Sequence, residues 1–206
     1  MDVGCFPGHL STALTKMGCE VFGISYEVEH ASRVFKTPAI HSIEECKIET
    51  EPFPFDDSVS DLVIFTETIA HLPWSPLPAL REIHKALKRG GYLVITSPND
   101  SYLGRRISRI INSLLFRSGF SNLTDLKKRL ELHSVYLTHH LKYTMREIKA
   151  ILGWADFTIM KEEHIPCSSG FGKINIIYLP IKIFASLMAR LFPQFRLYLL
   201  VIAKKP

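Results

Sequence analysis

Cysteine is scarce in this chain, and its spacing is not that of a metal or disulfide site. The 206 residues include four cysteines, at positions 5, 19, 46 and 167, with no Cys-x-x-Cys pair and no histidine pattern beside them. Such spacing favours neither a zinc site nor a disulfide framework, so we expect no bound metal. Scattered cysteines are typical of proteins from a reducing compartment.

Long apolar runs are also missing. The most apolar stretch, residues 174–191, is interrupted by Pro180, Lys182 and Arg190. It therefore falls short of the ~20 uninterrupted apolar residues that span a bilayer. The first residues lack the basic segment and apolar run of a secretory signal. These absences together predict a cytoplasmic protein.

The composition is that of a globular chain with unevenly placed charge. Hydrophobic residues make up 47% and charged residues 22%, which excludes a disordered or collagen-like chain. Residues 1–100 contain 8 Lys and Arg against 14 Asp and Glu, whereas residues 101–206 contain 17 against 6. The length predicts a single domain over residues 1–206 with an acidic first half and a basic second half.

Apolar periodicity predicts strands and helices in alternation. Strands are expected at residues 1–3, 20–25, 61–66, 92–96, 157–162 and 198–203, and helices at 9–17, 28–35, 77–87, 102–116 and 144–152. This order predicts an α/β fold with a mostly parallel sheet and a basic helical insertion after the Tyr92–Thr96 strand.

Some helices carry more specific signals. The first is expected to bury the apolar face made by Leu10, Ala13, Leu14 and Met17. The basic residues and glycines at 88–91 are expected to end the helix at 77–87. In the helix at 144–152, a threonine followed three residues later by a glutamate forms a capping-box pattern.

Gly4 and Gly8 stand in an Asp-x-Gly-x-x-x-Gly turn between the first strand and the first helix. In an open α/β sheet such a turn lies at the carboxyl edge, where ligands bind. Glycine lets a ligand approach the backbone closely. The spacing differs from Gly-x-Gly-x-x-Gly, which disfavours a nicotinamide or flavin dinucleotide. A tight turn without a ligand is the alternative.

Four segments, in order, resemble the class I S-adenosylmethionine-dependent methyltransferases. They are Asp2-Val3-Gly4-Cys5-Phe6-Pro7-Gly8, the segment from Pro52 to Val63, Glu67-Thr68-Ile69-Ala70-His71-Leu72, and the segment from Ala79 to Ile95. The likeness is strong up to about Asn99 and continues more loosely from Tyr143 to Phe157.

This resemblance implies a Rossmann-like domain in which helices sandwich the sheet. Residues 1–99 would form the cofactor-binding half, and residues 100–206 a basic, helix-rich lid and the C-terminal strands. It also implies an enzyme that transfers a methyl group from S-adenosylmethionine to its acceptor by in-line displacement.

The resemblance further implies which residues hold the cofactor. The Gly4–Gly8 turn would meet the methionine part, and the end of the second strand would meet the ribose. Adenine would lie beside residues 47–49, and the end of the 61–66 strand would face cofactor and substrate. The cofactor-binding residues so implied are Asp2, Gly4, Cys5, Phe6, Gly8, Ser25, Glu27, Lys47, Ile48, Glu49, Thr66 and Glu67.

Three positions depart from the family pattern. Ser25 stands where the family has an acid on the ribose hydroxyls, with Glu27 two residues on. Serine cannot supply a charge-assisted hydrogen bond, which is about twice as strong as a neutral one. Lys47 replaces an aspartate and Phe6 replaces a glycine. A non-catalytic binding module that kept the fold is therefore the first alternative.

His71 is the candidate catalytic base, because imidazole titrates near neutral pH and can deprotonate an acceptor hydroxyl. The alternative is a histidine that packs beside the cofactor without accepting a proton. Methyl transfer needs mainly alignment of the reacting atoms. We expect the acceptor to be a small molecule or a lipid- or saccharide-linked group, methylated at oxygen.

The basic half supports a second alternative, a peripheral membrane or nucleic-acid-binding protein. Residues 107–116 and 174–192 combine apolar and basic faces, as interfacial helices do. Nucleic acid is not expected, because no recognised nucleic-acid module surrounds the basic residues. Weak contact with an anionic membrane surface is the alternative to an ordinary lid helix.

Only three residues, Met1 to Val3, precede the glycine turn, whereas a strand usually has ~5–6 residues. The family places this strand at the centre of the sheet. We therefore expect that the chain is a truncated form, through fragmentation or a misplaced start.

Overall fold

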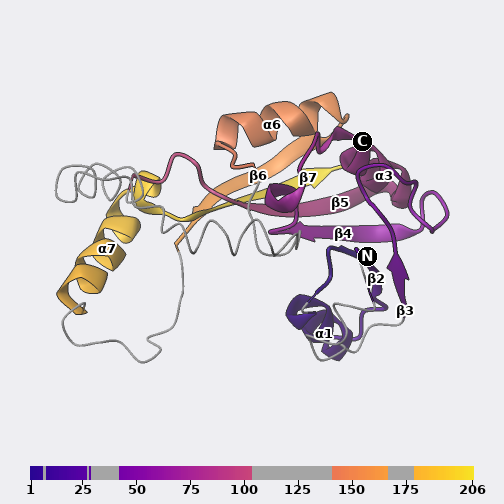
Figure 1. Cartoon of the computed structure of the whole chain (residues 1–206), viewed down its shortest axis with the longest axis horizontal. Coiled ribbons are helices and arrows are strands. Elements are labelled where there is room, and N and C mark those ends of the chain that lie inside the picture. Colours follow the sequence, from indigo (N-terminus) through magenta and orange to yellow (C-terminus); the bar gives the residue numbers. More distant parts are fainter. Residues whose placement is uncertain (7, 27, 29–41, 104–140, 167–178) are drawn as a thin grey trace, which may run out of the picture.

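The computed structural model describes residues 1–6, 8–26, 28, 42–103, 141–166 and 179–206 (Figure 1). Its strands are β1 (Asp2–Val3), β2 (Phe22–Ser25), β3 (Ser42–Glu45), β4 (Ser60–Thr66), β5 (Leu87–Pro98), β6 (Thr158–Ile165) and β7 (Tyr198–Lys204). Its helices are α1 (His9–Lys16), α3 (Leu77–Ala86), α6 (Met145–Trp154) and α7 (Leu179–Leu191), with short 3-10 helices η1 (Ile69–His71) and η3 (Pro193–Phe195).

The strands form one sheet in the order β3-β2-β1-β4-β5-β7-β6. Neighbours from β3 to β5 pair in parallel, whereas β7 runs antiparallel to both β5 and β6. The predicted mostly parallel sheet is confirmed. Because β1 to β5 are parallel, their carboxyl ends meet at one edge, which we call the carboxyl edge.

The middle of the sheet consists of apolar strands. Val63, Ile64 and Phe65 of β4 are buried, as are Leu93 and Ile95 of β5. Consecutive buried apolar residues are typical of parallel strands that helices cover on both faces. These two strands contribute much of the core.

Helices cover both faces of the sheet. β2 lies on one side of β1 and β5 on the other side of β4, so right-handed crossovers place α1 and α3 on opposite faces. Figure 1 shows α3 and α6 on one side and α1 on the other. Helix α3 buries Ala79, Leu80, Ile83 and Ala86, a spacing that follows one helix face.

Helix α3 ends earlier than the sequence predicts. Its last residue is Ala86, and Leu87 already has extended backbone. Residues 88–91 therefore lie in β5 and are not a glycine stop. Leu87 pairs with Ser60 of β4, and the carbonyl of Ala86 accepts a hydrogen bond from Val59 N–H at 3.0 Å. Pairing with β4 thus replaces the last turn of the helix.

The apolar face predicted for α1 is not its buried face. Leu10 and Met17 are exposed, whereas Ser11 is fully buried. The Ser11 hydroxyl donates a hydrogen bond to the carboxylate of Asp2 in β1. The prediction was wrong because a buried carboxylate must be hydrogen-bonded, and this requirement turns the polar Ser11 inward.

Strand β3 is absent from the sequence prediction. Its residues are half-buried or exposed, so they show no apolar pattern, and pairing with β2 defines the strand. The basic helical insertion predicted after the Tyr92–Thr96 strand lies outside the described residues. So does almost all of the helix predicted at 28–35.

The C-terminal end of helix α7 lies near the carboxyl edge, where Arg196 binds the carbonyl oxygens of Ala189 and His164. Tyr198 at the start of β7 pairs with Pro98 at the end of β5 and with Ile165 at the end of β6. The segment that joins β6 to β7, including α7, therefore begins and ends at this edge. No helix among the described residues combines the length and apolar character needed to cross a membrane.

The capping box of α6 is confirmed and gives a stability prediction. Thr144 Oγ1 accepts a hydrogen bond from Glu147 N–H at 3.3 Å, and Glu147 Oε2 accepts one from Thr144 N–H at 2.7 Å. Thr144→Ala should lower the free energy of unfolding by about 1 kcal/mol in urea titrations. Glu147→Gln keeps both hydrogen bonds and should cost less than half as much. Equal losses in the two variants would contradict this assignment.

Candidate active site

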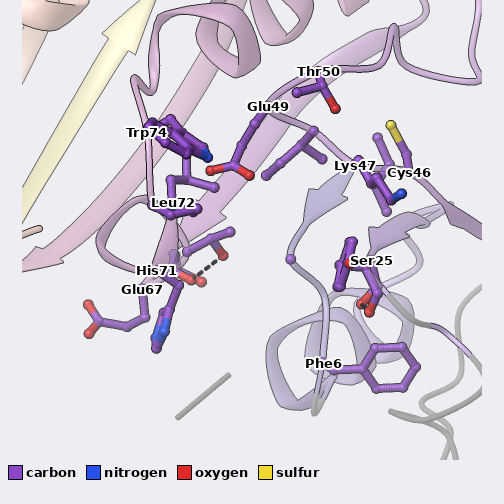
Figure 2. A pocket seen from close by; sticks show the side chains of 17 residues that line it. Phe6, Ser25, Cys46, Lys47, Glu49, Thr50, Glu67, His71, Leu72 and Trp74 are labelled. Carbon is purple, nitrogen blue, oxygen red and sulfur yellow. Dashed lines mark hydrogen bonds between the residues drawn. The ribbon is translucent and has the colours of Figure 1, made fainter. Parts of the chain in front are cut away.

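A cavity of about 490 Å³ opens at the carboxyl edge, beside the ends of β1 to β4 (Figure 2). Its volume lies in the range of ~300–1,000 Å³ that small ligands and cofactors need. The lining combines apolar side chains with hydroxyls, carboxylates and one ammonium group. The lining residues are Gly4, Phe6, Ile24, Ser25, Tyr26, Cys46, Lys47, Ile48, Glu49, Thr50, Thr66, Glu67, Thr68, His71, Leu72, Pro73 and Trp74.

Most of the predicted site residues meet in this cavity. Those that line it are Gly4, Phe6, Ser25, Lys47, Ile48, Glu49, Thr66, Glu67 and His71. The described lining does not include Asp2, Cys5 or Gly8. Glu27 lies outside the described residues.

Position 4 requires a glycine because Thr68 lies where a side chain would be. Its φ is +80°, a conformation that residues with a Cβ rarely adopt. A Cβ at this position would lie 2.1 Å from Oγ1 and 2.6 Å from Cγ2 of Thr68. The approach of a ligand was the expected reason for this glycine, but in the structure Thr68 occupies that space.

Thr68 joins the ends of β1 and β4. Its Oγ1 lies 3.1 Å from the carbonyl oxygen of Val3 and 3.0 Å from that of Thr66. On the other side of β1, the Gly4 N–H donates to the carbonyl of Ile24 at 2.8 Å. The glycine turn is therefore held from both neighbouring strands.

Asp2 and Cys5 support the turn from the core. Both side chains are buried. Burial raises the pKa of the Asp2 carboxyl, while the hydrogen bond from Ser11 works in the opposite direction. Burial also raises the pKa of the Cys5 thiol to about 12, so the thiol is neutral and unreactive at neutral pH.

Gly8 lies directly before helix α1 and is its N-cap residue. Its φ is +77°, which again favours glycine. Its carbonyl accepts hydrogen bonds from the N–H of Thr12 at 2.9 Å and from the Thr12 hydroxyl at 2.8 Å. Gly8 therefore shapes the entry into the helix.

The ends of β2 and β3 supply a second wall of the cavity. Ser25 is buried, and its hydroxyl lies 3.2 Å from the carbonyl oxygen of Tyr26. Lys47 is exposed and follows β3. The carboxylates of the described lining are Glu49 and Glu67. This wall thus has a hydroxyl and an ammonium group at the two positions where the resemblance leads one to expect acids.

A compact turn shapes residues 47–51. Lys47 N–H donates to Glu51 Oε2 at 2.8 Å, and Glu51 N–H donates to the Lys47 carbonyl at 2.9 Å. The Cys46 thiol lies 3.9 Å and 3.5 Å from the carbonyl oxygens of Glu51 and Pro52. Burial raises the pKa of this thiol to about 11, so it keeps its proton and donates.

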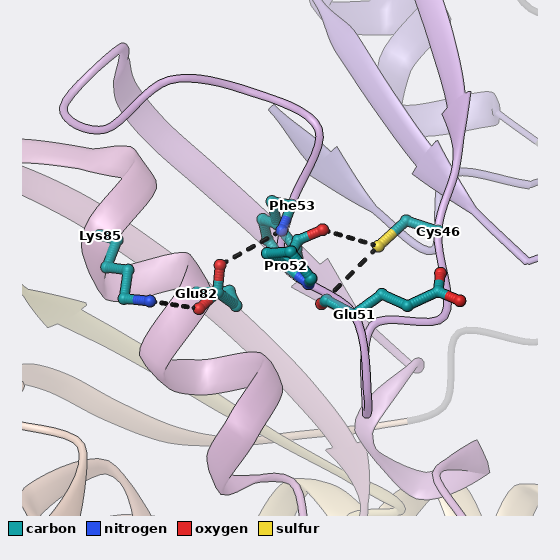
Figure 3. Close-up of polar contacts among 6 residues, drawn as sticks. All are labelled: Cys46, Glu51, Pro52, Phe53, Glu82 and Lys85. Carbon is teal, nitrogen blue, oxygen red and sulfur yellow. Dashed lines mark hydrogen bonds and ion pairs between the residues drawn. The ribbon is translucent and has the colours of Figure 1, made fainter.

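The same turn is tied to helix α3. Glu82 Oε2 accepts a hydrogen bond from Phe53 N–H at 3.2 Å, and Glu82 Oε1 pairs with Lys85 Nζ at 2.6 Å (Figure 3). The segment that carries Lys47 and Glu49 is therefore anchored to the helix that packs on β4 and β5.

Glu67 combines a strained backbone with a partly buried carboxyl. Its φ of +57° costs on the order of 1–2 kcal/mol for a residue with a Cβ. Thr96 of β5 holds it there: its hydroxyl donates to Glu67 Oε1 at 2.9 Å and lies 3.1 Å from Glu67 N. Burial raises the pKa of Glu67, and the Thr96 hydrogen bond partly offsets this. Strain of this kind clusters at functional sites.

His71 lies at the end of η1, whose backbone is fixed by a hydrogen bond from His71 N–H to the Thr68 carbonyl at 2.9 Å. Figure 2 shows its imidazole at the same end of the cavity as the Glu67 carboxylate. The cavity therefore has an acid and a potential base beside the ends of β4 and β5.

Several lining residues were not predicted from the sequence, and Thr68 and Trp74 are the most informative of them. Trp74 is 75% exposed although it lines the cavity. An exposed indole offers a flat apolar surface on which a ring can stack. The signal was present in the run His-Leu-Pro-Trp-Ser-Pro, which directly continues the segment from Glu67 to Leu72.

The cavity is suited to a ligand with an apolar ring and a cationic group. Trp74, Ile48 and Leu72 offer apolar surface, while Glu49 and Glu67 offer negative charge. Charges in a partly enclosed site interact more strongly than in bulk water. Among the described residues, no group of three or more histidine, cysteine or acidic side chains could hold a metal ion.

Comparisons with known proteins agree with this description. Residues 1–95 match the family model of the methyltransferase domain. The ubiquinone biosynthesis O-methyltransferase of Hydrogenovibrio crunogenus is 30% identical over 109 residues, which are 50% of this chain and 43% of that protein. The ribosomal protein L11 methyltransferase of Campylobacter concisus is 29% identical over 105 residues, 51% of this chain and 36% of that protein. The chain spans less than half the length of these relatives.

Solved structures show the same fold. A methyltransferase of Archaeoglobus fulgidus that depends on S-adenosylmethionine has a TM-score of 0.63 at 18% identity, over 99% of this chain and 84% of that one. A methyltransferase of Haloferax volcanii in complex with the Trm112 activator has a TM-score of 0.64 at 17% identity, over 100% and 81%. The predicted family resemblance and the Rossmann-like fold are confirmed.

The contact between Gly4 and Thr68 predicts a coupled pair of substitutions. Gly4→Ala should lower the free energy of unfolding by more than about 3 kcal/mol, because strain and a steric clash add together. Gly4→Ala combined with Thr68→Ala removes the two nearest clashing atoms and should recover part of this loss. Urea unfolding of the two single variants and the double variant measures the coupling. Additive losses would show that Thr68 does not constrain Gly4.

The raised pKa of Glu67 predicts that wild type and Glu67→Gln differ in stability by an amount that depends on pH. The folded protein holds this proton more tightly than the unfolded chain, so ionisation destabilises the fold as pH rises through the ordinary glutamate range. Glu67→Gln keeps an acceptor for Thr96 and should melt higher than wild type at neutral pH. This advantage should vanish at acidic pH, where both residues are uncharged.

Glu163→Gln is the matched control, and its expected change in stability has the opposite sign. The hydrogen bond from Lys161 lowers the pKa of this exposed acid, so the variant should lose a little stability at neutral pH. A Glu67→Gln variant that melts no higher than wild type at neutral pH would contradict the assigned environment of Glu67.

Proposed function

We propose that this chain transfers a methyl group to an oxygen of a small or lipid-linked acceptor, because residues 1–95 match the family model of the methyltransferase domain and the described residues have the fold of S-adenosylmethionine-dependent methyltransferases. The observation that carries the proposal is the cavity at the carboxyl edge, which collects most of the predicted cofactor-binding residues. S-adenosylmethionine supplies an electrophilic methyl group on a positively charged sulfur.

The lining fits this cofactor in size and chemistry. Its volume of about 490 Å³ suits a nucleoside joined to an amino acid. Ile48 and Trp74 would bound the purine, and Ser25 with Lys47 would face the ribose and ring edges. Glu49 and Glu67 would attract the two positive charges of the cofactor, its ammonium and its sulfonium.

Two residues are candidates for accepting the acceptor's proton. His71 ends η1 and lines the cavity, and a neutral imidazole is a suitable base at physiological pH. Glu67 is the second candidate, since a carboxyl with a raised pKa is a stronger base. Thr96 fixes one oxygen of Glu67, which would hold its carboxylate in one orientation toward the acceptor.

The oxygen acceptor is supported by the name of one relative, an O-methyltransferase of ubiquinone biosynthesis. The departures at Ser25 and Lys47 support the rival function, a binding module without catalysis. Titration calorimetry with S-adenosylhomocysteine separates the two: micromolar affinity supports the methyltransferase, and absence of binding supports the rival.

His71→Ala should lower the rate of methyl transfer by on the order of 10²-fold while changing cofactor affinity little. The assay follows labelled methyl groups from S-adenosylmethionine into phenolic, lipid-linked and protein acceptors. His9→Ala is the matched control, because His9 is exposed on α1 outside the cavity. Unchanged transfer by the His71 variant would show that His71 is not the base, and label only in protein would overturn the small-molecule acceptor.

Ser25→Asp should tighten cofactor binding by about 1 kcal/mol, or roughly fivefold, since a carboxylate makes stronger hydrogen bonds to ribose hydroxyls. The unbound variant should melt lower than wild type, because Ser25 is buried and a buried carboxylate is costly. Ser25→Asn has a similar shape without the charge and should not bind tighter. Weaker binding by Ser25→Asp would place the ribose elsewhere.

A further inference from the structure

Helix α7 presents large apolar side chains to solvent. Five of them, in α7 and the residue after it, are 43–62% exposed: Ile183, Phe184, Leu187, Leu191 and Phe192. The four within the helix recur at intervals of one, three and four residues and therefore share one face. We call these five residues the α7 face.

The C-terminal end of α7 is fixed to the sheet. Ala189 is buried, and the guanidinium of Arg196 binds carbonyl oxygens at the end of the helix. Its Nε donates to the Ala189 carbonyl at 2.9 Å, and its Nη1 donates to the carbonyl of His164 in β6 at 3.1 Å. A cation at the last carbonyls of a helix stabilises that end. Figure 1 shows α7 projecting from the sheet beyond this anchor.

Helix α7 belongs to a segment that lies at the same edge of the sheet as the cavity. The segment between β6 and β7 begins and ends at the carboxyl edge, where Ile165 and Pro98 both pair with Tyr198. The cavity opens at the same edge of the same sheet. The C-terminal end of α7 and the opening of the cavity therefore lie at the same edge of the sheet.

The charges near the α7 face indicate which kind of surface it can bind. Residues 164–206 contain six Lys and Arg and no Asp or Glu, and Arg190 is exposed on α7 itself. Glu163 of β6 interacts electrostatically with Arg196, so an acid lies near the end of α7. An apolar helix face that carries an exposed cation is still the pattern that anionic bilayers bind. A second copy of the chain would bring like charges together, which opposes self-association through this face.

We propose that the α7 face inserts into the headgroup region of an anionic phospholipid bilayer, with Arg190 at the phosphates. Phenylalanine and leucine side chains would enter the acyl boundary, as in other interfacial helices. The carboxyl edge would then face the bilayer. If the proposed methyl transfer holds, this arrangement would give the cavity access to a lipid-linked acceptor.

Sedimentation with large vesicles tests the proposal without cofactor or acceptor. The chain should bind vesicles of phosphatidylcholine with phosphatidylglycerol, bind pure phosphatidylcholine less, and be released by salt. Phe184→Glu with Leu187→Glu should weaken binding at least tenfold. Arg190→Gln should weaken it less and reduce its salt dependence.

Trp154→Glu is the matched control. Trp154 is 67% exposed, but it ends α6 shortly before β6 begins, at the opposite edge of the sheet. Binding should be unchanged in this variant. Circular dichroism melts check that each variant is folded, and Leu187→Gln alone serves if the double variant is not.

Three results would overturn the proposal: no binding to anionic vesicles, equal binding by the folded α7 variant, or equal loss in Trp154→Glu. Light scattering gives a fourth, a dimer that dissociates in the α7 variant, because the face would then bind a second copy. Vesicle binding by a chain that shows no methyl transfer would leave this proposal standing and would count only against the proposed function.

Discussion

The cavity depends on the contact between Gly4 and Thr68. Gly4 follows β1 and Thr68 follows the end of its neighbour β4, and a Cβ on Gly4 would lie only 2.1 Å from Thr68 Oγ1. Thr68 Oγ1 also reaches the carbonyls of Val3 and Thr66. The ends of both strands are thereby held together beside the cavity, which Gly4, Thr66 and Thr68 line.

The rest of the site is positioned by buried polar groups that are paired away from the cavity. Asp2 binds Ser11, Cys46 binds the carbonyls of its own turn, and Glu82 binds the backbone of Phe53. Each contact satisfies a group that would be costly to leave unpaired. Together they hold the lining segments in place, so that Lys47, Glu49 and Ser25 can face the cavity.

The acidic and basic halves of the chain contribute different parts of the structure. The acidic half builds the cavity, and its carboxylates at Glu49 and Glu67 suit a cationic ligand. The basic half ends in a segment without acidic residues, which carries α7 at the same edge of the sheet. A ligand site and a cationic, apolar helix thus share one edge because β6 and β7 extend the parallel sheet antiparallel to each other.

The sequence by itself determined the order of strands and helices, the mostly parallel sheet, the capping box at Thr144 and most of the cavity lining. The strands, the helices and the capping box depend on local periodicity and on short motifs, which are visible in one dimension. The lining residues were implied by the resemblance to the methyltransferase family, and the glycine turn and the shared edge of parallel strands agree with that placement. The sequence did not determine β3, the end of α3 or the inward face of α1. Those follow from pairing with β2, pairing with β4 and the hydrogen bond to Asp2. Only the tertiary structure placed Thr68 against Gly4, because a contact between residues 64 positions apart arises when two strands become neighbours and leaves no local trace in the sequence.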